Sequence, residues 1–507
     1  MIQVELSIDE FAYDVRSLIQ AFYPDKKLVF IDSDYMLNNN MLKEDIELKI
    51  SVKYMEHFIG LSFFKNGVPI LENSVEVVYD IKNTNSFMGK LNLTMEQRKI
   101  YKNELKRLLY NMLSEVTGQL LPWGTLTGIR PTKIPMKMLE EHCKESDIKK
   151  HMSEEYLCSK EKADLCVNIA KKEYDILNKI DYENGYSIYI GIPFCPTTCL
   201  YCSFTSYSID KYEDQVEDYL KALFMEIEDI SSRVHNKKLI TVYLGGGTPT
   251  TLNADQLERV LVKIKTSFPM EHVRELTVEA GRPDSITIDK LKVLKEQGVT
   301  RISINPQTMN QKTLDVIGRK HTVDQIIEAF HMARQTGHDN INMDLIIGLP
   351  GENYEDVSYT LNEIDKLKPD SLTVHTLAIK RAARLNTNKE QYMEMTPTDT
   401  IKMFTLTSEY AMNAGYKPYY LYRQKNMADN LENIGYSKEG KEGIYNILIM
   451  EEKHTIIALG AGASSKFVSQ DGDLIERSEN VKSVKDYIER VNEMMERKHL
   501  LIERNFS

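Results

Sequence analysis

Cysteine is scarce in this chain, which has six cysteines among 507 residues. So few thiols in so long a chain do not form the disulfide framework that stabilises small secreted proteins. Cys143, Cys158 and Cys166 are scattered through sequence of helical pattern. We interpret these three as buried structural thiols, which leaves one close group of three cysteines to explain.

The chain also lacks an excess of positive charge and any long apolar run. Its formal net charge is -11 at pH 7, whereas nonspecific binding to nucleic acid or to anionic membrane selects for excess Lys and Arg. No stretch approaches the ~20 apolar residues of a membrane-spanning helix. The opening residues, MIQVELSIDE, are acidic where a signal peptide has a basic start. We therefore expect a cytoplasmic protein with no nucleic-acid partner and no membrane insertion.

Changes of residue pattern along the chain predict four parts. Residues 1–120 combine β-rich runs with a long helical pattern at 95–117, which predicts a small N-terminal α/β domain. Residues 121–184 begin as a loop rich in Gly and Pro and continue as Lys/Glu-rich helical sequence, which predicts a connector. Residues 185–385 form the predicted core, and residues 386–507 a C-terminal α+β region that covers the substrate.

The C-terminal region contains four recognisable stretches. We predict a helix in TIKMFTLTSEYAMNAG, a tyrosine-rich loop in YKPYYLYRQKN, strands around IYNILIMEE and HTIIALGAGASS, and a closing helix after residue 482.

Six β-branched runs alternate with amphipathic helical patterns in the predicted core. The runs are YSIYIGIPF, LITVYLGGG, RELTVEA, TRISINPQ, NINMDLIIGLP and DSLTVHTLA. Strands that alternate with helices predict βαβ units with parallel strands. Unusual polar or glycine-rich residues follow the ends of these runs. A barrel collects its active site from all strand ends, whereas an open sheet has one crevice. We therefore predict a partial (β/α)6 barrel.

Three cysteines lie close together in GIPFCPTTCLYC, residues 191–202. Cys195, Cys199 and Cys202 have the spacing C-x3-C-x2-C. A structural zinc site normally takes four side-chain ligands, and a disulfide would leave one thiol over. Three thiolates suit a [4Fe-4S] cluster whose fourth iron stays open for another ligand. A three-ligand zinc site remains the alternative at this point.

Low-potential iron with an open position can donate an electron to S-adenosylmethionine (SAM) and cleave it to a 5′-deoxyadenosyl radical. Residues at the other strand ends would then bind SAM. The GGGTPT stretch at 245–250 lets backbone approach a ligand closely, and the carboxylate of Glu279 could accept hydrogen bonds from it. Gln307 follows the fourth run. Asp344 lies in an apolar run, where an unpaired acid is costly, so a ligand or Arg319 is expected to meet it. Solvent-exposed rim or surface positions are the alternative for these side chains.

The motifs of the core resemble a known family. YIGIPFCPTTCLYC, GGGTPT, VEAGRP, NPQ…IGR and MDLIIGLPGE follow one another over about 185–380. In this order they resemble the radical SAM superfamily, and within it the oxygen-independent coproporphyrinogen III dehydrogenase-like family. The additional N-terminal domain, with PWGTLTGIRPTK and YYLYRQKN, resembles its HemZ branch. The resemblance implies a radical SAM barrel and an oxidoreductase that converts coproporphyrinogen III to protoporphyrinogen IX in porphyrin and haem biosynthesis.

The resemblance also implies roles for individual residues. The cluster ligands would be Cys195, Cys199 and Cys202. The positions that match contacts to the cluster-bound SAM are Tyr189, Gly246, Gly247, Thr248 and Glu279. The positions that match contacts to a second SAM are Tyr201, Gln307, Arg319, Asp344 and Ala378.

The sequence departs from the family pattern at two positions. The family histidine of Y-x-H-I-P-F-C is Gly191 here, and the additional cysteine of the dehydrogenase type is Phe204. The stretch CSF is closer to the haem-chaperone branch. A haem-binding chaperone with His375 as an axial ligand, or a radical SAM enzyme that modifies another tetrapyrrole, is therefore an alternative function.

A tetrapyrrole with four carboxylates should meet cations, because Arg binds carboxylates bidentately. The candidate substrate ligands after the sixth run are Lys380, Arg381 and Arg384, and further candidates are Arg130, Lys133 and Arg423. Solvated surface charge is the alternative for each of them. The chemistry also implies a low-potential electron donor such as flavodoxin or ferredoxin.

Overall fold

The computed structural model describes residues 1–31, 46–55, 57–78, 91, 93–128, 130–234, 236–378, 385, 395, 399–424, 431–469 and 474–506. They form two compact units, Met1–Asn168 and Ile169–Ser507. Within these ranges, no helix is both long and apolar enough to cross a membrane. The predicted division into four parts stays a prediction.

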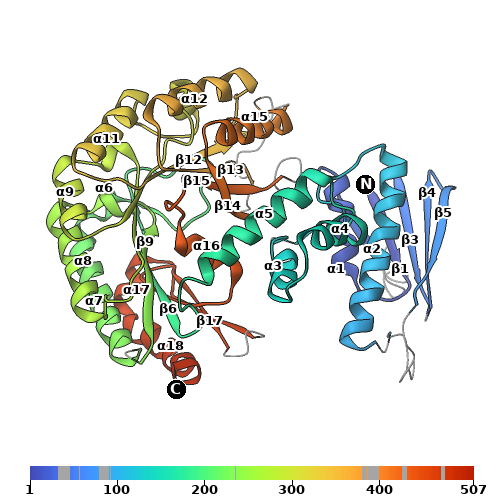
Figure 1. Cartoon of the computed structure of the whole chain (residues 1–507), viewed down its shortest axis with the longest axis horizontal. Helices are drawn as coiled ribbons and strands as arrows, with labels where there is room; N and C mark the ends of the chain where they lie inside the picture. The colour runs from blue at the N-terminus through green and yellow to red at the C-terminus, as the bar shows by residue number, and fades with distance from the viewer. Residues whose placement is uncertain are drawn as a thin grey trace. The chain divides into compact units, whose positions relative to one another are not determined.

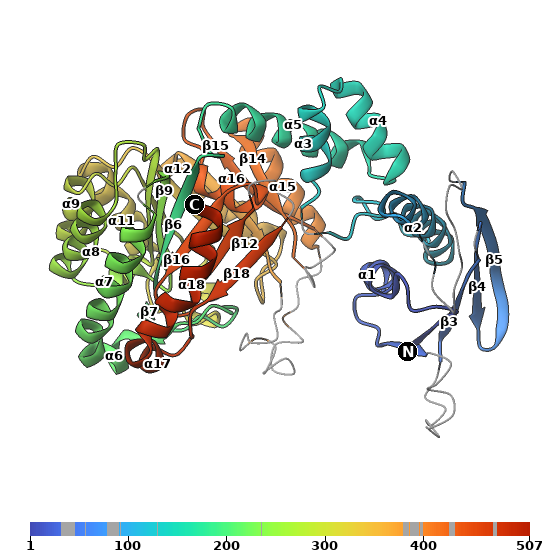
Figure 2. The same ribbon diagram turned by 90° about the horizontal axis from the view of Figure 1, so that it is seen from below.

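The first unit contains a five-stranded sheet with helices α1 and α2 on one face (Figure 2). The strand order is β2-β1-β3-β4-β5, in which β1 pairs parallel with β2 and β3 and the other pairs are antiparallel. The strands are β1 Ile2–Leu6, β2 Leu28–Ile31, β3 Leu48–Tyr54, β4 Phe58–Lys65 and β5 Val68–Glu76, and the helices are α1 Ala12–Phe22 and α2 Met95–Thr117.

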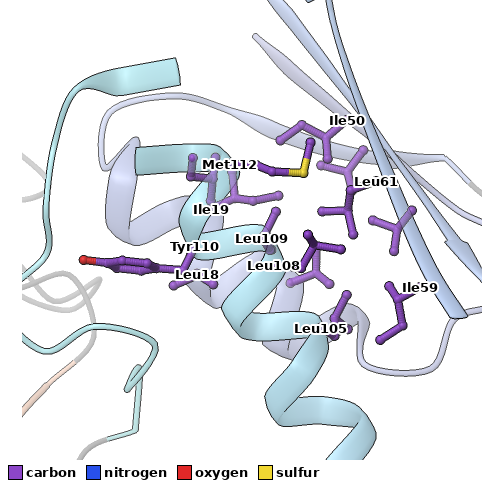
Figure 3. Close-up of a cluster of buried hydrophobic side chains, with 14 of the residues drawn as sticks. Leu18, Ile19, Ile50, Ile59, Leu61, Leu105, Leu108, Leu109, Tyr110 and Met112 are labelled. Atoms are coloured by element: carbon purple, nitrogen blue, oxygen red, sulfur yellow. The ribbon is translucent and has the colours of Figure 1, made fainter. Parts of the chain in front are cut away.

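Helix α2 has the bounds that its sequence pattern predicts. Thr94 and Gln97 form a capping box at its start, and Gly118, with a φ of 69°, ends it. Leucines and Met112 of α2 pack on α1 and on Ile50 and Leu61 of the sheet (Figure 3). The Lys/Glu-rich sequence that follows is helical as predicted, in α3 Lys133–Glu140, α4 Glu145–Glu155 and α5 Lys160–Leu177.

The second unit is built on six parallel strands in the order β13-β12-β11-β10-β9-β6. Helices between them cover the outer side of the sheet (Figure 1). The strands are β6 Gly185–Ile192, β9 Lys238–Gly246, β10 Glu275–Gly281, β11 Arg301–Ile304, β12 Ile341–Ile347 and β13 Ser371–Thr376. The main helices are α7 Val216–Arg233, α8 Ala254–Ser267, α9 Ile288–Glu296, α10 Gln311–Val316, α11 Val323–Gln335 and α12 Tyr354–Leu367. The predicted partial (β/α)6 barrel is therefore confirmed.

C-terminal strands extend this sheet at both edges. Beyond β13 lie β15, antiparallel to β13, and then β14, antiparallel to β15. Beyond β6 lies β16, which is parallel to β6, followed by β17 and β18, each antiparallel to the strand before it. The elements are α15 Thr400–Asn413, β14 Lys417–Tyr422, β15 Asn433–Ser437, α16 Ile444–Glu451, β16 Thr455–Leu459, β17 Ser464–Val468, β18 Ile475–Glu479, α17 Val484–Glu489 and α18 Val491–Phe506.

Two sequence predictions in this region are wrong. The run IYNILIMEE, predicted as a strand, is helix α16, and the predicted tyrosine-rich loop contains strand β14. A short apolar run fits a strand and a buried helix equally well. A distant residue decides here, because the carboxylate of Glu275 accepts hydrogen bonds from the N–H groups of Ile444, at 2.6 Å, and Tyr445, at 3.3 Å.

A buried ion pair joins the closing helix α18 to α7. Lys498 Nζ lies 2.8 Å from Glu226 Oε1, and both side chains have no exposed surface. Glu226 also accepts hydrogen bonds from Asn480, Tyr487 and the N–H of Gly460. Because the charge of Glu226 is fully hydrogen-bonded, this network fixes the turn after β16 against the barrel.

Candidate active site

Five of the six parallel strands each carry one half-buried residue between otherwise buried neighbours. These residues are Tyr189 in β6, Tyr243 in β9, Glu279 in β10, Asp344 in β12 and His375 in β13. The rings of Tyr189 and Tyr243 stack at 6.1 Å, and the hydroxyl of Tyr243 donates to Glu279. His375 Nε2 lies 3.7 Å from Asp344 Oδ2. Side chains far apart in the sequence thus form one polar face across the sheet.

The two carboxyl groups on this face differ in protonation. Burial raises the pKa of Glu279 to about 7, the charge of Asp344 adds to this effect, and the hydrogen bond from Tyr243 opposes it. Burial alone would also raise the pKa of Asp344. The nearby His375 and the hydrogen bond from Asn342 outweigh burial and hold that pKa below its usual value. Asp344 is therefore a carboxylate at neutral pH, while Glu279 is divided between its two forms.

Tyrosines from the C-terminal region complete this face, and local sequence patterns offer little sign of their roles. Tyr445 of α16 stacks on Tyr243, with ring centroids 4.4 Å apart. Tyr422 of β14 places its hydroxyl 3.3 Å from His375 Nδ1. Figure 1 shows α16 on the concave side of the sheet, opposite the outer helices. The unusual density of tyrosine in YKPYYLYRQKN, residues 416–426, marks the segment that holds Tyr422 but not Tyr445.

The three clustered cysteines lie on a loop that continues from β6. Cys195 is in the short strand β7 Phe194–Cys195, Cys199 is buried, and Cys202 is half-buried. The N–H of Leu200 donates to the carbonyl of Ile317 at 2.9 Å, which ties the loop to the segment after α10. All six cysteines lie within the described ranges and are free thiols.

The glycines at the end of β9 allow the cysteine loop to approach closely. The N–H of Gly247 donates to the carbonyl of Ile192 and that of Thr248 to the carbonyl of Phe194, both at 2.7 Å. A Cβ atom on Gly247 would lie 2.5 Å from the oxygen of Phe194. The hydroxyl of Thr248 lies 3.5 Å from Sγ of Cys195. Gly246, with a φ of 103°, adopts a conformation that favours glycine.

This donor set fits an iron–sulfur cluster. Three thiols lie on one loop, and burial raises the pKa of Cys195 to about 11, an effect that the hydroxyl of Thr248 opposes. The guanidinium of Arg282 lies 3.9 Å from Sγ of Cys199, where it would stabilise a thiolate. Among the described residues, no three His, Cys, Asp or Glu side chains are arranged around a single metal ion. A cluster places each thiolate on a different iron atom.

A second group of polar atoms belongs to the segment after β11, whose Arg319 interacts with Cys199 of the cysteine loop. Gln307 Oε1, Asn305 Oδ1 and Arg319 Nε are buried and have no hydrogen-bond partner among the residues that the structure describes. Backbone bonds fix Gln307, whose N–H donates to the carbonyl of Asp344 at 2.9 Å. Burial raises the pKa of Tyr201, and the neighbouring Arg319 opposes this effect. Buried polar atoms without partners are costly, so this group is suited to a polar ligand.

The structure thus brings most of the predicted site residues together. Ala378 is half-buried just after β13. Arg423 is buried after β14, whereas Arg130 and Lys133 belong to the first unit. The three candidate substrate cations lie outside the described residues: Lys380, Arg381 and Arg384. Sequence reasoning missed Tyr243, Tyr422, Tyr445 and Arg282.

Gly191 stands at the family histidine position. A Cβ atom on Gly191 would lie 3.4 Å from the oxygen of Leu459 and 3.6 Å from that of Ala461. These are ordinary contacts, so a methyl group fits there. Phe204, at the other departure, is 70% exposed.

Comparison with known proteins agrees with this geometry. The model of the radical SAM superfamily matches residues 189–364. The chain is 43% identical to the oxygen-independent coproporphyrinogen-III oxidase-like protein HemZ of Bacillus subtilis. The alignment spans 415 residues, which are 81% of this chain and 83% of that protein. The chain belongs to the HemZ branch of the radical SAM superfamily. The resemblance found in the sequence is therefore confirmed, and the superfamily implies a [4Fe-4S] cluster and SAM.

More distant relatives of this radical SAM protein have different names. The heme chaperone HemW of Bacillus subtilis is 30% identical over 310 residues, which are 61% of this chain and 76% of that protein. The oxygen-independent coproporphyrinogen III oxidase of Escherichia coli is 30% identical over 196 residues, which are 39% of this chain and 42% of that protein. The solved coproporphyrinogen III oxidase HemN of Escherichia coli is similar with a TM-score of 0.49 and 24% identity, over 64% of this chain and 73% of that one. Membership of the superfamily therefore leaves the reaction open.

Proposed function

We propose that this protein carries out the oxygen-independent oxidative decarboxylation of coproporphyrinogen III to protoporphyrinogen IX, in porphyrin and haem biosynthesis. The observation that carries the proposal is that buried atoms of Gln307, Asn305 and Arg319, all after β11, have no hydrogen-bond partner among the described residues, and that Arg319 interacts with Cys199 of the cysteine loop. Two propionates react in this conversion, so two SAM molecules are consumed. A second polar ligand site next to the first fits that requirement.

In this proposal Cys195, Cys199 and Cys202 hold the cluster. The cluster, when bound with SAM, would supply a carbon-centred radical that removes a hydrogen atom from a substrate propionate. The resulting propionate radical would then lose CO2 and pass one electron to an acceptor, which would leave a vinyl group. A low-potential donor such as flavodoxin or ferredoxin would reduce the cluster.

The protein's own residues would position SAM. The backbone at Gly246 and Gly247, the hydroxyl of Thr248 and the Tyr189 ring would contact the SAM at the cluster. Glu279 would accept hydrogen bonds from its ammonium or ribose groups. The second SAM would meet the buried atoms of Gln307, Asn305 and Arg319 and three further residues: Tyr201, Asp344 and Ala378.

The remaining residue roles and the organisation of the chain belong to the same proposal. Substrate carboxylates would pair with Lys380, Arg381 and Arg384, and part of residues 386–507 would cover the substrate. The tyrosine-lined face would exclude water from the radical. We place the reaction in the cytoplasm.

A haem-binding, chaperone-like function is the second candidate. It is favoured by Phe204, which stands where the dehydrogenase type has a further cysteine, and by relatives named heme chaperone. His375 would be the axial ligand. In this structure its ring nitrogens lie 3.3 Å from the hydroxyl of Tyr422 and 3.7 Å from the carboxylate of Asp344, so ligation would require one of these contacts to break. Radical modification of another tetrapyrrole is a third candidate.

Anaerobic incubation with coproporphyrinogen III, SAM and a reductant tests these functions. We expect protoporphyrinogen IX with the parent protein and none with Cys199→Ala. Cys143→Ala is the matched control, because Cys143 is half-buried in the first unit, and it should be active. Haem retention without decarboxylation would support the chaperone function instead, and a methylated or linear product would support the third candidate.

A further inference from the structure

The guanidinium of Arg282 contacts the cysteine loop directly. Arg282 follows β10 and is 2% exposed. Its Nη1 donates to the hydroxyl of Thr197 at 2.6 Å and to the carbonyl of Thr197 at 3.1 Å, and it lies 3.9 Å from Sγ of Cys199. A full positive charge, largely shielded from water, therefore points at one of the three thiols.

Asp284 fixes the orientation of this guanidinium. Nε and Nη2 of Arg282 donate to the two carboxylate oxygens of Asp284 at 3.0 and 2.6 Å. Burial alone would raise the pKa of Asp284, but His321 and Arg282 outweigh it and hold the pKa well below its usual value. The carboxylate is thus charged, and with the contacts to the loop every nitrogen of the guanidinium has a partner.

The thiol of Cys195 accepts a hydrogen bond from the neutral hydroxyl of Thr248 at 3.5 Å. The charge of Arg282 also acts on Cys195, but Cys199 has Nη1 of Arg282 at 3.9 Å, and Arg319 interacts with it as well. Two guanidinium groups therefore act on the middle cysteine of the motif.

We propose that Arg282, held by Asp284, sets the reduction potential of the cluster, a role that rests on the cluster proposed above. Reduction adds one electron from a low-potential donor and forms no bond, so the cluster gains one negative charge. A positive charge and an N–H donor at a ligating sulfur stabilise the more negative state and raise the potential. The carboxylate of Asp284 opposes part of this effect.

The test is a redox titration of the anaerobically reconstituted full-length protein, without SAM, followed by EPR spectroscopy. We expect Arg282→Gln to shift the midpoint to more negative potential and Asp284→Asn to shift it to more positive potential. Arg274→Gln removes the same charge from an exposed position just before β10 and should not shift it. A residue that merely holds the loop together would not give shifts of opposite sign.

Unchanged midpoints, or shifts of both variants in the same direction, would overturn the inference. If Arg282→Gln does not retain its cluster, Asp284→Asn decides alone: a more positive midpoint supports the inference, and an unchanged or more negative one overturns it. Iron content separates this result from the proposed function. A parent protein that binds no iron after reconstitution refutes the cluster itself, whereas a cluster with insensitive midpoints refutes only the role of Arg282.

Discussion

Gly247 offers a small change with a large expected effect on the cysteine loop. Alanine at this position would place its Cβ 2.5 Å from the oxygen of Phe194, 2.9 Å from that of Ile192 and 3.0 Å from the carbonyl carbon of Phe194. To reach an ordinary contact of 3.4 Å, the backbone next to Cys195 must move by about 0.9 Å. Overpacking of this kind costs about 1–3 kcal/mol. Both carbonyls also accept 2.7 Å hydrogen bonds from the two residues that follow β9, which the movement would stretch.

We therefore expect Gly247→Ala to lower the free energy of unfolding of the metal-free protein and to lower its iron content after anaerobic reconstitution. Urea unfolding and iron analysis measure the two effects. The matched control is Gly191→Ala, whose Cβ would have no contact closer than 3.4 Å and which should behave like the parent. Parental stability and iron content in Gly247→Ala would refute the close approach of β9 to the cysteine loop.

Three further changes test other parts of the structure. SAM binding, measured by calorimetry, should weaken by up to about tenfold per pH unit below pH 7, because the pKa of Glu279 is raised to about 7 and its carboxylate is lost on acidification. The Glu279→Gln variant should bind SAM weakly at every pH. SAM binding to the parent protein that does not depend on pH would contradict the role of Glu279. Lys498→Met should lower the free energy of unfolding, measured in urea, by about 3–5 kcal/mol, because it leaves Glu226 buried without its cation. The double variant with Glu226→Gln should recover part of this loss. A double variant that recovers none of it would count against the ion pair. Gln307→Ala should reduce bound SAM from two molecules to one in equilibrium dialysis; an unchanged ratio would remove Gln307 from the second site.

The barrel could be predicted from the sequence because its signals are local. Runs of β-branched residues alternate with helical patterns, and each parallel strand of the core coincides with a predicted run. Glu279 and Asp344 could be found for the same reason, since each is an acid in or at the end of an apolar run. Because parallel strands end at the same edge of a sheet, their positions in the third and fifth runs indicated a shared site.

The rest of the site depends on contacts between distant segments. Tyr445 reaches Tyr243 because Glu275 of β10 caps α16, which no local pattern shows. Tyr422 reaches His375 because β14 and β15 add to the edge of β13. Arg282 was assigned no role from the sequence, and only its contacts with Asp284 and Thr197 show that it is directed at Cys199.

The most direct test of the account is EPR spectroscopy of the reduced, oxygen-free protein with and without SAM. Three cysteine ligands leave one iron of the cluster free for SAM, so we expect a [4Fe-4S] signal whose shape changes when SAM is added. Stoichiometric zinc without iron after reconstitution, or an iron–sulfur signal that SAM does not alter, would contradict this central claim.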